Sequence, residues 1–314
     1  MILTVSLNPA VDRTSVLEEL IPGTVMRTRS TVTRAGGKGI NVARAVCAAG
    51  GEALALYLAG GYTGSQLSAL LAEEGVPARA VPCVTETRIS LQIAEQSGRF
   101  SNINDRGGPV SATEIDALLT LTRELLGPED TLVLGGALPH GAPDDSYARF
   151  VREFSPSCRA VAVDADGAAL RAAVEAGPTL LKPNAEELAR YAELSCPTEE
   201  ELLDAARALA GRTGGAVLLS LGADGAALVT ANQLLRALPT GARAISTVGA
   251  GDSLLAGFLL RQETGGSPAE CLRFGSAVAT AKVECPGPTM PETAQILAWE
   301  KKIKIVSLRR SGSR

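Results

Sequence analysis

The chain has 314 residues, of which 46% are hydrophobic and 20% charged, and its net charge is −4. This composition supports a packed core and excludes extensive disorder. Only 3% of residues are aromatic and no basic run lies in the body of the chain, which argues against a nucleic-acid partner. The sequence shows no bilayer-length apolar run and no basic signal region at its start, so we expect a cytoplasmic protein without a membrane partner.

The six cysteines form no C-x-x-C pair, so we expect reduced thiols and neither a disulfide framework nor a zinc site. The one basic cluster, Lys301, Lys302 and Lys304 with Arg309 and Arg310, is interpreted as a solvated tail.

Short β-rich runs alternate with longer helical stretches along most of the chain. Strands are predicted at residues 2–7, 53–58, 131–134, 160–163, 179–181 and 216–219. Helices are predicted at residues 40–49, 64–74, 112–126, 144–154, 167–175, 185–194 and 199–212. The strands are apolar on both faces, which is typical of a parallel sheet covered by helices on either side. We expect one α/β domain over residues 1–314, with a doubly wound, mostly parallel sheet.

Two segments interrupt this alternation. Residues 25–33 have β propensity with interleaved polar positions, and residues 88–94 and 99–104 flank a turn at Gly98. They predict strands outside the main sheet, within segments of about 13–34 and 87–105. A small second sheet covering a cleft is the simplest arrangement, and its apolar face would have to be buried, for example against a second copy of the chain.

The most informative motif covers residues 246–253. Gly249 and Gly251 bracket Ala250, and Asp252 follows at the start of an apolar helical run. Glycines and the unpaired N–H groups of a helix N-terminus form an anion hole that suits a transferring phosphoryl group. Asp252 would lie in the first turn, where it could accept a proton from an attacking hydroxyl. The alternative is that Asp252 only caps the helix.

A glycine-rich turn at residues 35–44 opens another helix without P-loop or dinucleotide spacing. There Gly37 allows a ligand to approach, Lys38 offers charge and Asn41 offers polar groups, as in a polyol and phosphate site; the alternative is a tight loop with a helix start. Asp12 follows the first strand, where it could hold sugar hydroxyls or simply form an Asx turn.

Two further motifs follow buried strands. Asn184 and Glu187 have the spacing of a capping box, and the same pair could hold Mg²⁺ through water. Residues 220–225 are either a hairpin turn or a backbone surface for a nucleotide.

Taken in order, residues 7–12, 36–44, 182–188, 220–225 and 247–253 resemble the motifs of the phosphofructokinase B family of ribokinase-type carbohydrate kinases. The resemblance spans nearly the whole chain. It implies a doubly wound α/β core with a small β lid, and ATP-dependent phosphorylation of a sugar hydroxyl with Mg²⁺.

The resemblance also implies a role for each matching residue. Asp252 would be the catalytic base, and Gly249, Ala250 and Gly251 the anion hole. The ATP site would comprise Lys182, Asn184, Ser220, Gly222 and Gly225, with Glu187 at magnesium. The sugar phosphate would be held by Asp12, Gly37, Lys38, Asn41, Arg88 and Arg27.

Within the family the chain is most similar to hexose-phosphate kinases. The expected reaction converts fructose 1-phosphate to fructose 1,6-bisphosphate, with tagatose 6-phosphate and fructose 6-phosphate as alternative substrates. The family also implies a homodimer through the lid. From other classes of function, a catalytically silent sugar-phosphate sensor and a dinucleotide-dependent oxidoreductase remain alternatives, although the first strand lacks a dinucleotide fingerprint.

Overall fold

A ten-stranded sheet runs through the centre of the molecule in the computed structural model, which describes residues 1–238, 241–287 and 289–308. Its strand order is β14-β13-β12-β11-β10-β9-β8-β1-β4-β5. The strands from β11 to β5 are parallel, whereas β12, β13 and β14 extend one edge antiparallel. The parallel strands are β1 (Ile2–Ser6), β4 (Ala53–Ala59), β5 (Ala78–Pro82), β8 (Thr131–Gly135), β9 (Ala160–Asp164), β10 (Leu180–Leu181) and β11 (Ala216–Ser220). The antiparallel ones are β12 (Ala226–Val229), β13 (Leu234–Ala237) and β14 (Ile305–Ser307).

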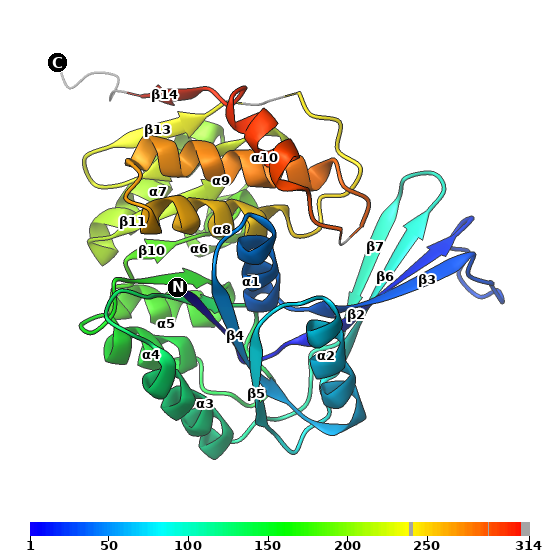
Figure 1. The fold of residues 1–314 in the computed structure, drawn as a ribbon. Helices are drawn as coiled ribbons and strands as arrows, with labels where there is room; N and C mark the ends of the chain where they lie inside the picture. Colours follow the sequence, from blue (N-terminus) through cyan, green and yellow to red (C-terminus); the bar gives the residue numbers. More distant parts are fainter. Residues whose placement is uncertain (239–240, 288, 309–314) are drawn as a thin grey trace.

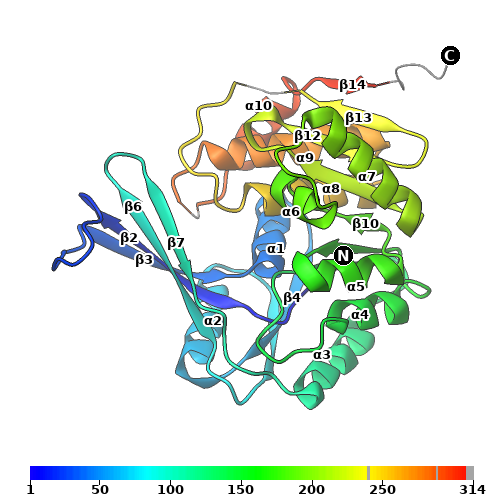
Figure 2. The same cartoon turned by 180° about the vertical axis from the view of Figure 1, so that it is seen from behind.

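Helices cover both faces of this sheet (Figures 1 and 2). One face carries α1 (Lys38–Ala48), α2 (Gly61–Glu73), α8 (Ala250–Glu263), α9 (Pro268–Val283) and α10 (Thr293–Glu300). The other carries α3 (Ala112–Leu125), α4 (Ser146–Phe154), α5 (Gly167–Ala176), α6 (Ala185–Tyr191) and α7 (Glu199–Thr213). Successive strand residues enter opposite cores, as with Ile2 and Leu3. The predicted doubly wound architecture is therefore confirmed.

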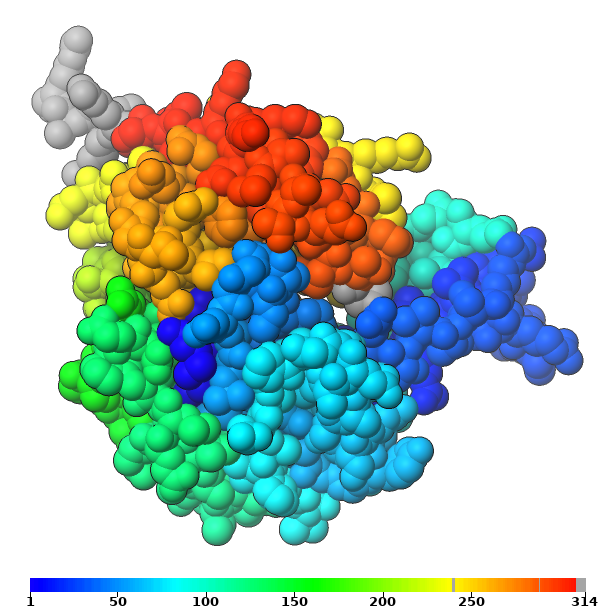
Figure 3. All heavy atoms as spheres, viewed as in Figure 1, coloured from blue at the N-terminus to red at the C-terminus, as the bar shows by residue number. Residues whose placement is uncertain are grey.

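A smaller sheet projects from the body as an arm (Figure 3). It contains β2 (Ala10–Leu17), β3 (Ser30–Gly36), β6 (Arg88–Glu95) and β7 (Phe100–Asn104), in the order β3-β2-β6-β7. We call this sheet the lid. Asp12, Thr14 and Gln92 face a pocket at its base, and Leu91 and Ile103 pair on the opposite face with exposed fractions of 39% and 54%.

Local details of the lid and the tail differ from expectation. Residues 25–29 form an exposed loop and β3 starts only at Ser30, while Ala10–Leu17, expected to begin as a turn, is a strand. The tail is not simply solvated, because Ile305–Ser307 pair with β13 at the sheet edge. Arg309 and Arg310 lie outside the described residues. All six cysteines are free, and none of the described helices has the length and apolarity that a membrane span requires.

Candidate active site

The site lies where the parallel strands reach their carboxyl ends. Asp164 closes β9, Lys182 follows β10, and Ser220 closes β11. The N-termini of α1 and α8 and the base of the lid complete the site. Ligands of open parallel sheets bind at this edge, so the fold itself brings together residues that are far apart in sequence.

The N-terminus of α8 has the geometry of an anion hole. Gly249 is the N-cap residue with φ of 76°, a left-handed conformation that favours glycine. Within the described residues, the N–H groups of Gly251 and Asp252 donate to no acceptor. A Cβ atom on Gly251 would lie 3.3 Å from Nζ of Lys182, so a lysine stands directly beside this helix end. The helix dipole and the ammonium both favour an anion here.

Asp252 lies in the first turn of α8, as predicted, and is 8% exposed. Its Oδ2 accepts a hydrogen bond of 2.8 Å from Nδ2 of Asn41, whose Oδ1 in turn accepts one of 2.7 Å from Arg44. Burial, and secondarily the charge of Asp164, raise the pKa of Asp252 to about 6, although Lys182 and Lys38 act in the opposite direction. A carboxylate with such a pKa is a suitable proton acceptor near neutral pH.

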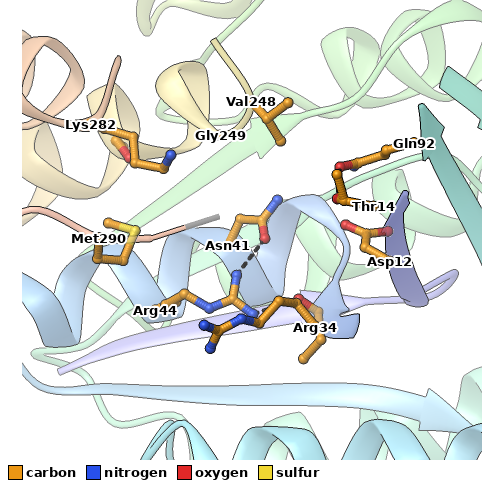
Figure 4. A pocket seen from close by; sticks show the side chains of 12 residues that line it. Asp12, Thr14, Arg34, Asn41, Arg44, Gln92, Val248, Gly249, Lys282 and Met290 are labelled. Carbon is orange, nitrogen blue, oxygen red and sulfur yellow. Dashed lines mark hydrogen bonds between the residues drawn. The ribbon is translucent and has the colours of Figure 1, made fainter. Parts of the chain in front are cut away.

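Asp12 approaches the same pocket from strand β2 of the lid, and not from a turn. Its carboxyl group rests over Gly36, where an added Cβ atom would come within 2.4 Å of it. Burial raises the pKa of Asp12 to about 6, against the opposing charges of Arg88 and Arg44. Figure 4 shows Asp12, Asn41 and Gly249 around one pocket.

An ion-pair network connects α1 with the strand ends. Lys38 Nζ lies 2.7 Å from Asp164 and 3.0 Å from Glu187, and Lys182 lies 2.9 Å from the second Asp164 oxygen. Burial would raise the pKa of Asp164, but the two lysines outweigh it and lower that pKa. The same carboxylates raise the pKa of Lys38 in spite of its burial. Lys38, expected at the substrate phosphate, is therefore engaged with protein carboxylates.

The capping box at the start of α6 is confirmed. Asn184 Oδ1 accepts from the Glu187 N–H at 2.8 Å, and Glu187 Oε2 accepts from the Asn184 N–H at 2.9 Å. Glu187 Oε1 faces Lys38. The Glu187 side chain therefore caps α6 with one oxygen and contributes its other oxygen to the polar site.

The turn after β11 is also confirmed as a connection between antiparallel strands. Gly222 and Gly225 adopt φ of 61° and 94°, and a Cβ atom on Gly225 would lie 2.4 Å from the carbonyl oxygen of Ala237. Ser220 forms an isolated parallel β-bridge with Asn184, so this turn lies next to the N-terminal cap of α6.

The two arginines assigned to substrate phosphate have different surroundings. The Arg88 guanidinium, half-buried near Asp12, donates to the carbonyl oxygens of Asn8 and Asp105 at 2.8–3.2 Å. Arg27 lies in the exposed loop between β2 and β3. No hydrogen bond or ion pair joins the exposed Arg27 side chain to the rest of the described chain, so the structure does not bring Arg27 to the other site residues.

Sequence reasoning missed several polar residues of this site, among them Asp164, Arg44 and Lys282. Asp164 directly follows a predicted buried strand, a signal that was available. Arg44 stands one helical turn after Asn41 and pairs with Glu74 at 2.7 Å. Lys282, near the end of α9, faces the pocket from the far side of Gly249 (Figure 4), and only tertiary packing brings it there.

The donor set fits a Mg²⁺ ion shared with a nucleotide. Asp164 and Glu187 both pair with the Lys38 ammonium group, so their carboxylates are neighbours. No cluster of three or more metal-ligating side chains occurs within the described residues. Mg²⁺ commonly takes one or two carboxylates and completes its shell with water and phosphate oxygens, so this pair suffices only with phosphate present.

The fold and the site together define a carbohydrate kinase. Residues 4–295 match the family model described as pfkB family carbohydrate kinase, and the chain belongs to this family. It is 35% identical to a 1-phosphofructokinase of Haloferax volcanii, covering 98% of this chain and 99% of the relative. It is 34% identical to ATP-dependent 6-phosphofructokinase isozyme 2 of Mycobacterium tuberculosis, covering 91% and 85%. A structure of phosphofructokinase-2 from Escherichia coli in complex with potassium superposes with a TM-score of 0.90 at 30% identity, covering 96% and 98%.

Proposed function

We propose that this sugar-phosphate kinase transfers the γ-phosphoryl group of ATP to fructose 1-phosphate, giving fructose 1,6-bisphosphate. The observation that carries the proposal is Asp252, buried in the first turn of α8 beside an anion hole and held by Asn41. Several relatives, including the one from Haloferax volcanii, are named 1-phosphofructokinase, which supports the choice of sugar.

The sugar lies between the lid and α1 in this proposal. Asp12 accepts hydrogen bonds from sugar hydroxyls, and Asn41 fixes the Asp252 carboxylate beside the reacting hydroxyl. Gly37 has φ of 118° and keeps the backbone close to the ligand. We assign the substrate phosphate to Arg88, because its guanidinium donates to neutral carbonyl oxygens and makes no ion pair within the described residues, whereas Lys38 is ion-paired with two carboxylates. Arg27 would reach the substrate phosphate only if the β2–β3 loop moved inward.

ATP lies along the α6 and β11 side, against Asn184 and the turn of Ser220, Gly222 and Gly225. Lys182 meets its phosphates next to Gly251. Asp164 and Glu187 would hold Mg²⁺, which neutralises phosphate charge when bound. Lys38 keeps these two carboxylates together before the nucleotide arrives.

Phosphoryl transfer then needs one proton acceptor and one anion hole. Asp252 takes the proton of the attacking sugar hydroxyl, and the oxygen forms a bond to the γ-phosphorus while the bond to ADP breaks. The N–H groups of Gly249, Gly251 and Asp252 have no acceptor within the described residues, and at this helix end they stabilise negative charge on the transferring group. The N–H of Ala250, which the sequence also assigned to the anion hole, instead donates to the Thr247 carbonyl oxygen at 3.2 Å. The lid excludes water, which limits hydrolysis of ATP.

The test is a coupled ADP-release assay with ATP and Mg²⁺ on fructose 1-phosphate, fructose 6-phosphate, tagatose 6-phosphate and fructose. The highest kcat/KM is expected with fructose 1-phosphate. Preference for fructose 6-phosphate would agree instead with the Mycobacterium tuberculosis relative and overturn the choice of sugar. Turnover of free fructose alone would remove the phosphate role of Arg88. Absence of turnover with all four would favour a sensor.

We also propose a homodimer in which two lids pack on one another. The face opposite the pocket carries Leu91 and Ile103 as register partners, both partly exposed. Burial of this face in a partner lid would cover the apolar side chains without blocking Asp12.

A further inference from the structure

Lys282 is a buried cation to which the preceding mechanism gives no task. It lies in the last turn of α9 and is only 2% exposed. Its Nζ donates a hydrogen bond of 2.7 Å to the carbonyl oxygen of Gly287. An ammonium has three N–H donors, and this is the one bond it makes within the described chain. Burial lowers the pKa of Lys282, because it disfavours the charged ammonium. A buried lysine at this position therefore indicates a function that offsets this cost.

The side chain of Lys282 runs against the anion hole. A Cβ atom on Gly249 would lie 3.8 Å from Cε of Lys282. The next residue, Val283, accepts hydrogen bonds on its carbonyl oxygen from the N–H groups of Ile245 and Ser246. The end of α9 therefore holds the chain that leads directly into residues 247–249.

The position of α9 relative to α8 is fixed by close glycine contacts. A Cβ atom on Gly257 of α8 would lie 2.9 Å from Cα of Gly275, and one on Gly275 would lie 2.6 Å from the Leu254 carbonyl oxygen. With the helices locked in this register, the backbone of Lys282 is held at a fixed distance from Gly249.

The charge of Lys282 also acts on the base. The Asp252 carboxylate favours the charged form of Lys282, and by reciprocity the ammonium favours ionised Asp252. The groups that face Lys282 are Asp252, Arg44 and Cys285; those that face Asp252 also include Asp164, Lys182, Lys38, Asn41 and Asp12.

We propose that Lys282 is a positioning residue for phosphoryl transfer: its ammonium ties the 285–287 turn to the end of α9, and its side chain supplies a positive charge behind Gly249 of the anion-hole loop. Lys282 acts through the loop and through Asp252, without touching ATP or sugar. The inference rests on the proposed kinase mechanism but not on which sugar is phosphorylated.

The experiment compares wild type with Lys282→Met and Lys282→Ala, using the sugar that the wild type phosphorylates. Lys302→Met is the matched control, since Lys302 is an exposed lysine stacked on Trp299. We expect kcat to fall roughly 10- to 100-fold in both Lys282 variants. KM for ATP and sugar should stay nearly unchanged, and the acid limb of the kcat profile should move to higher pH. Ammonium chloride, compared with sodium or potassium chloride at equal ionic strength, should restore part of kcat in Lys282→Ala, because the free ion refills the site.

Three kinetic results would overturn the inference, and a fourth result would do so if the wild type is inactive. Unchanged kcat would remove the role, and a raised KM for ATP with unchanged kcat would mean direct contact with ATP. A kcat that falls only with the folded fraction, with an unmoved acid limb and no response to ammonium, would mean simple packing. If the wild type has no activity, the pH dependence of Tm still reports the ionisation of Asp252. The pH range over which Tm falls as Asp252 ionises should shift to higher pH in Lys282→Met. An unchanged range would refute the inference.

Discussion

Asp252 has to be ionised to accept a proton, although burial favours its neutral form. With a pKa of about 6, a growing fraction is protonated as the pH falls below that value, so kcat of the wild type should decline on the acid side of about pH 6. A pH profile of kcat at saturating substrate measures this limb. A flat profile down to pH 5 would contradict Asp252 as the base.

Replacement of the base gives the direct test of its role. Asp252→Asn keeps the size of the side chain and removes the proton acceptor, so kcat should fall roughly 100-fold or more while KM for both substrates changes little. Steady-state kinetics with the coupled assay measures both parameters. Asp116→Asn is the matched control, since Asp116 is an exposed carboxylate on α3 that pairs with Arg149 outside the site, and this variant should keep full kcat. Near-normal turnover of Asp252→Asn would disprove the assignment.

The same substitution should make the protein more stable at neutral pH. A carboxyl group whose folded pKa is raised contributes stability at low pH that is lost as the pH rises through the folded pKa, here between about 4 and 6. Asn is neutral throughout, so Tm of Asp252→Asn should exceed that of wild type at pH 8, and the difference should shrink toward pH 4. A lower Tm at pH 8 would show that Asp252 is stabilised, not strained, by its surroundings.

Among the elements, the pair α8 and α9 determines the geometry of the anion hole. Gly275→Ala would place Cβ 2.6 Å from the Leu254 carbonyl oxygen, so the helices must separate. We expect a loss of about 1–3 kcal/mol in unfolding free energy, with a reduced kcat. Chemical denaturation and the kinetic assay measure the two effects.

Gly211→Ala is the control for that experiment. Gly211 lies inside α7, where an added Cβ atom meets nothing within 4 Å. Alanine has the higher helix propensity, so this variant should gain up to about 1 kcal/mol and keep full activity. Equal losses in the two variants would mean that the α8–α9 contact has no special role.

Sequence patterns predicted six strands of the central sheet because burial on both faces leaves continuous apolar runs, as in residues 160–163 and 216–219. They gave no strand range for Ala78–Pro82 and Leu234–Ala237, which lie at or next to a sheet edge. They placed lid strands only from about residue 13 and so missed the start of Ala10–Leu17, whose polar residues serve the pocket on one face of the lid. The short edge strand Ile305–Ser307 was missed because it exists only through pairing with β13. Tertiary contacts, not local propensity, decide such strands.

At the scale of the whole molecule, the site is assembled from residues between Asp12 and Lys282. The sequence named those next to glycines or strand ends, such as Asp252 and Asn184. It could not show that Lys38 pairs with Asp164, or that Lys282 stands behind Gly249, because both depend on how α1 and α9 pack. The motifs thus predicted which residue types the site contains, whereas the packing of the helices determines which of those residues form ion pairs and lie close together.

The lid gives the last prediction, which concerns association. Leu91→Lys places a charge on the face opposite the pocket, so it should convert a dimer to a monomer, as judged by light scattering. Leu297→Lys is the matched control, since Leu297 on α10 is a similarly exposed leucine (45%) outside the lid. If two lids brace each other, the monomer should also show a raised KM for sugar, because Asp12 and Arg88 both belong to lid strands. A wild-type monomer at assay concentration, or a dimer that survives Leu91→Lys, would exclude packing through this face.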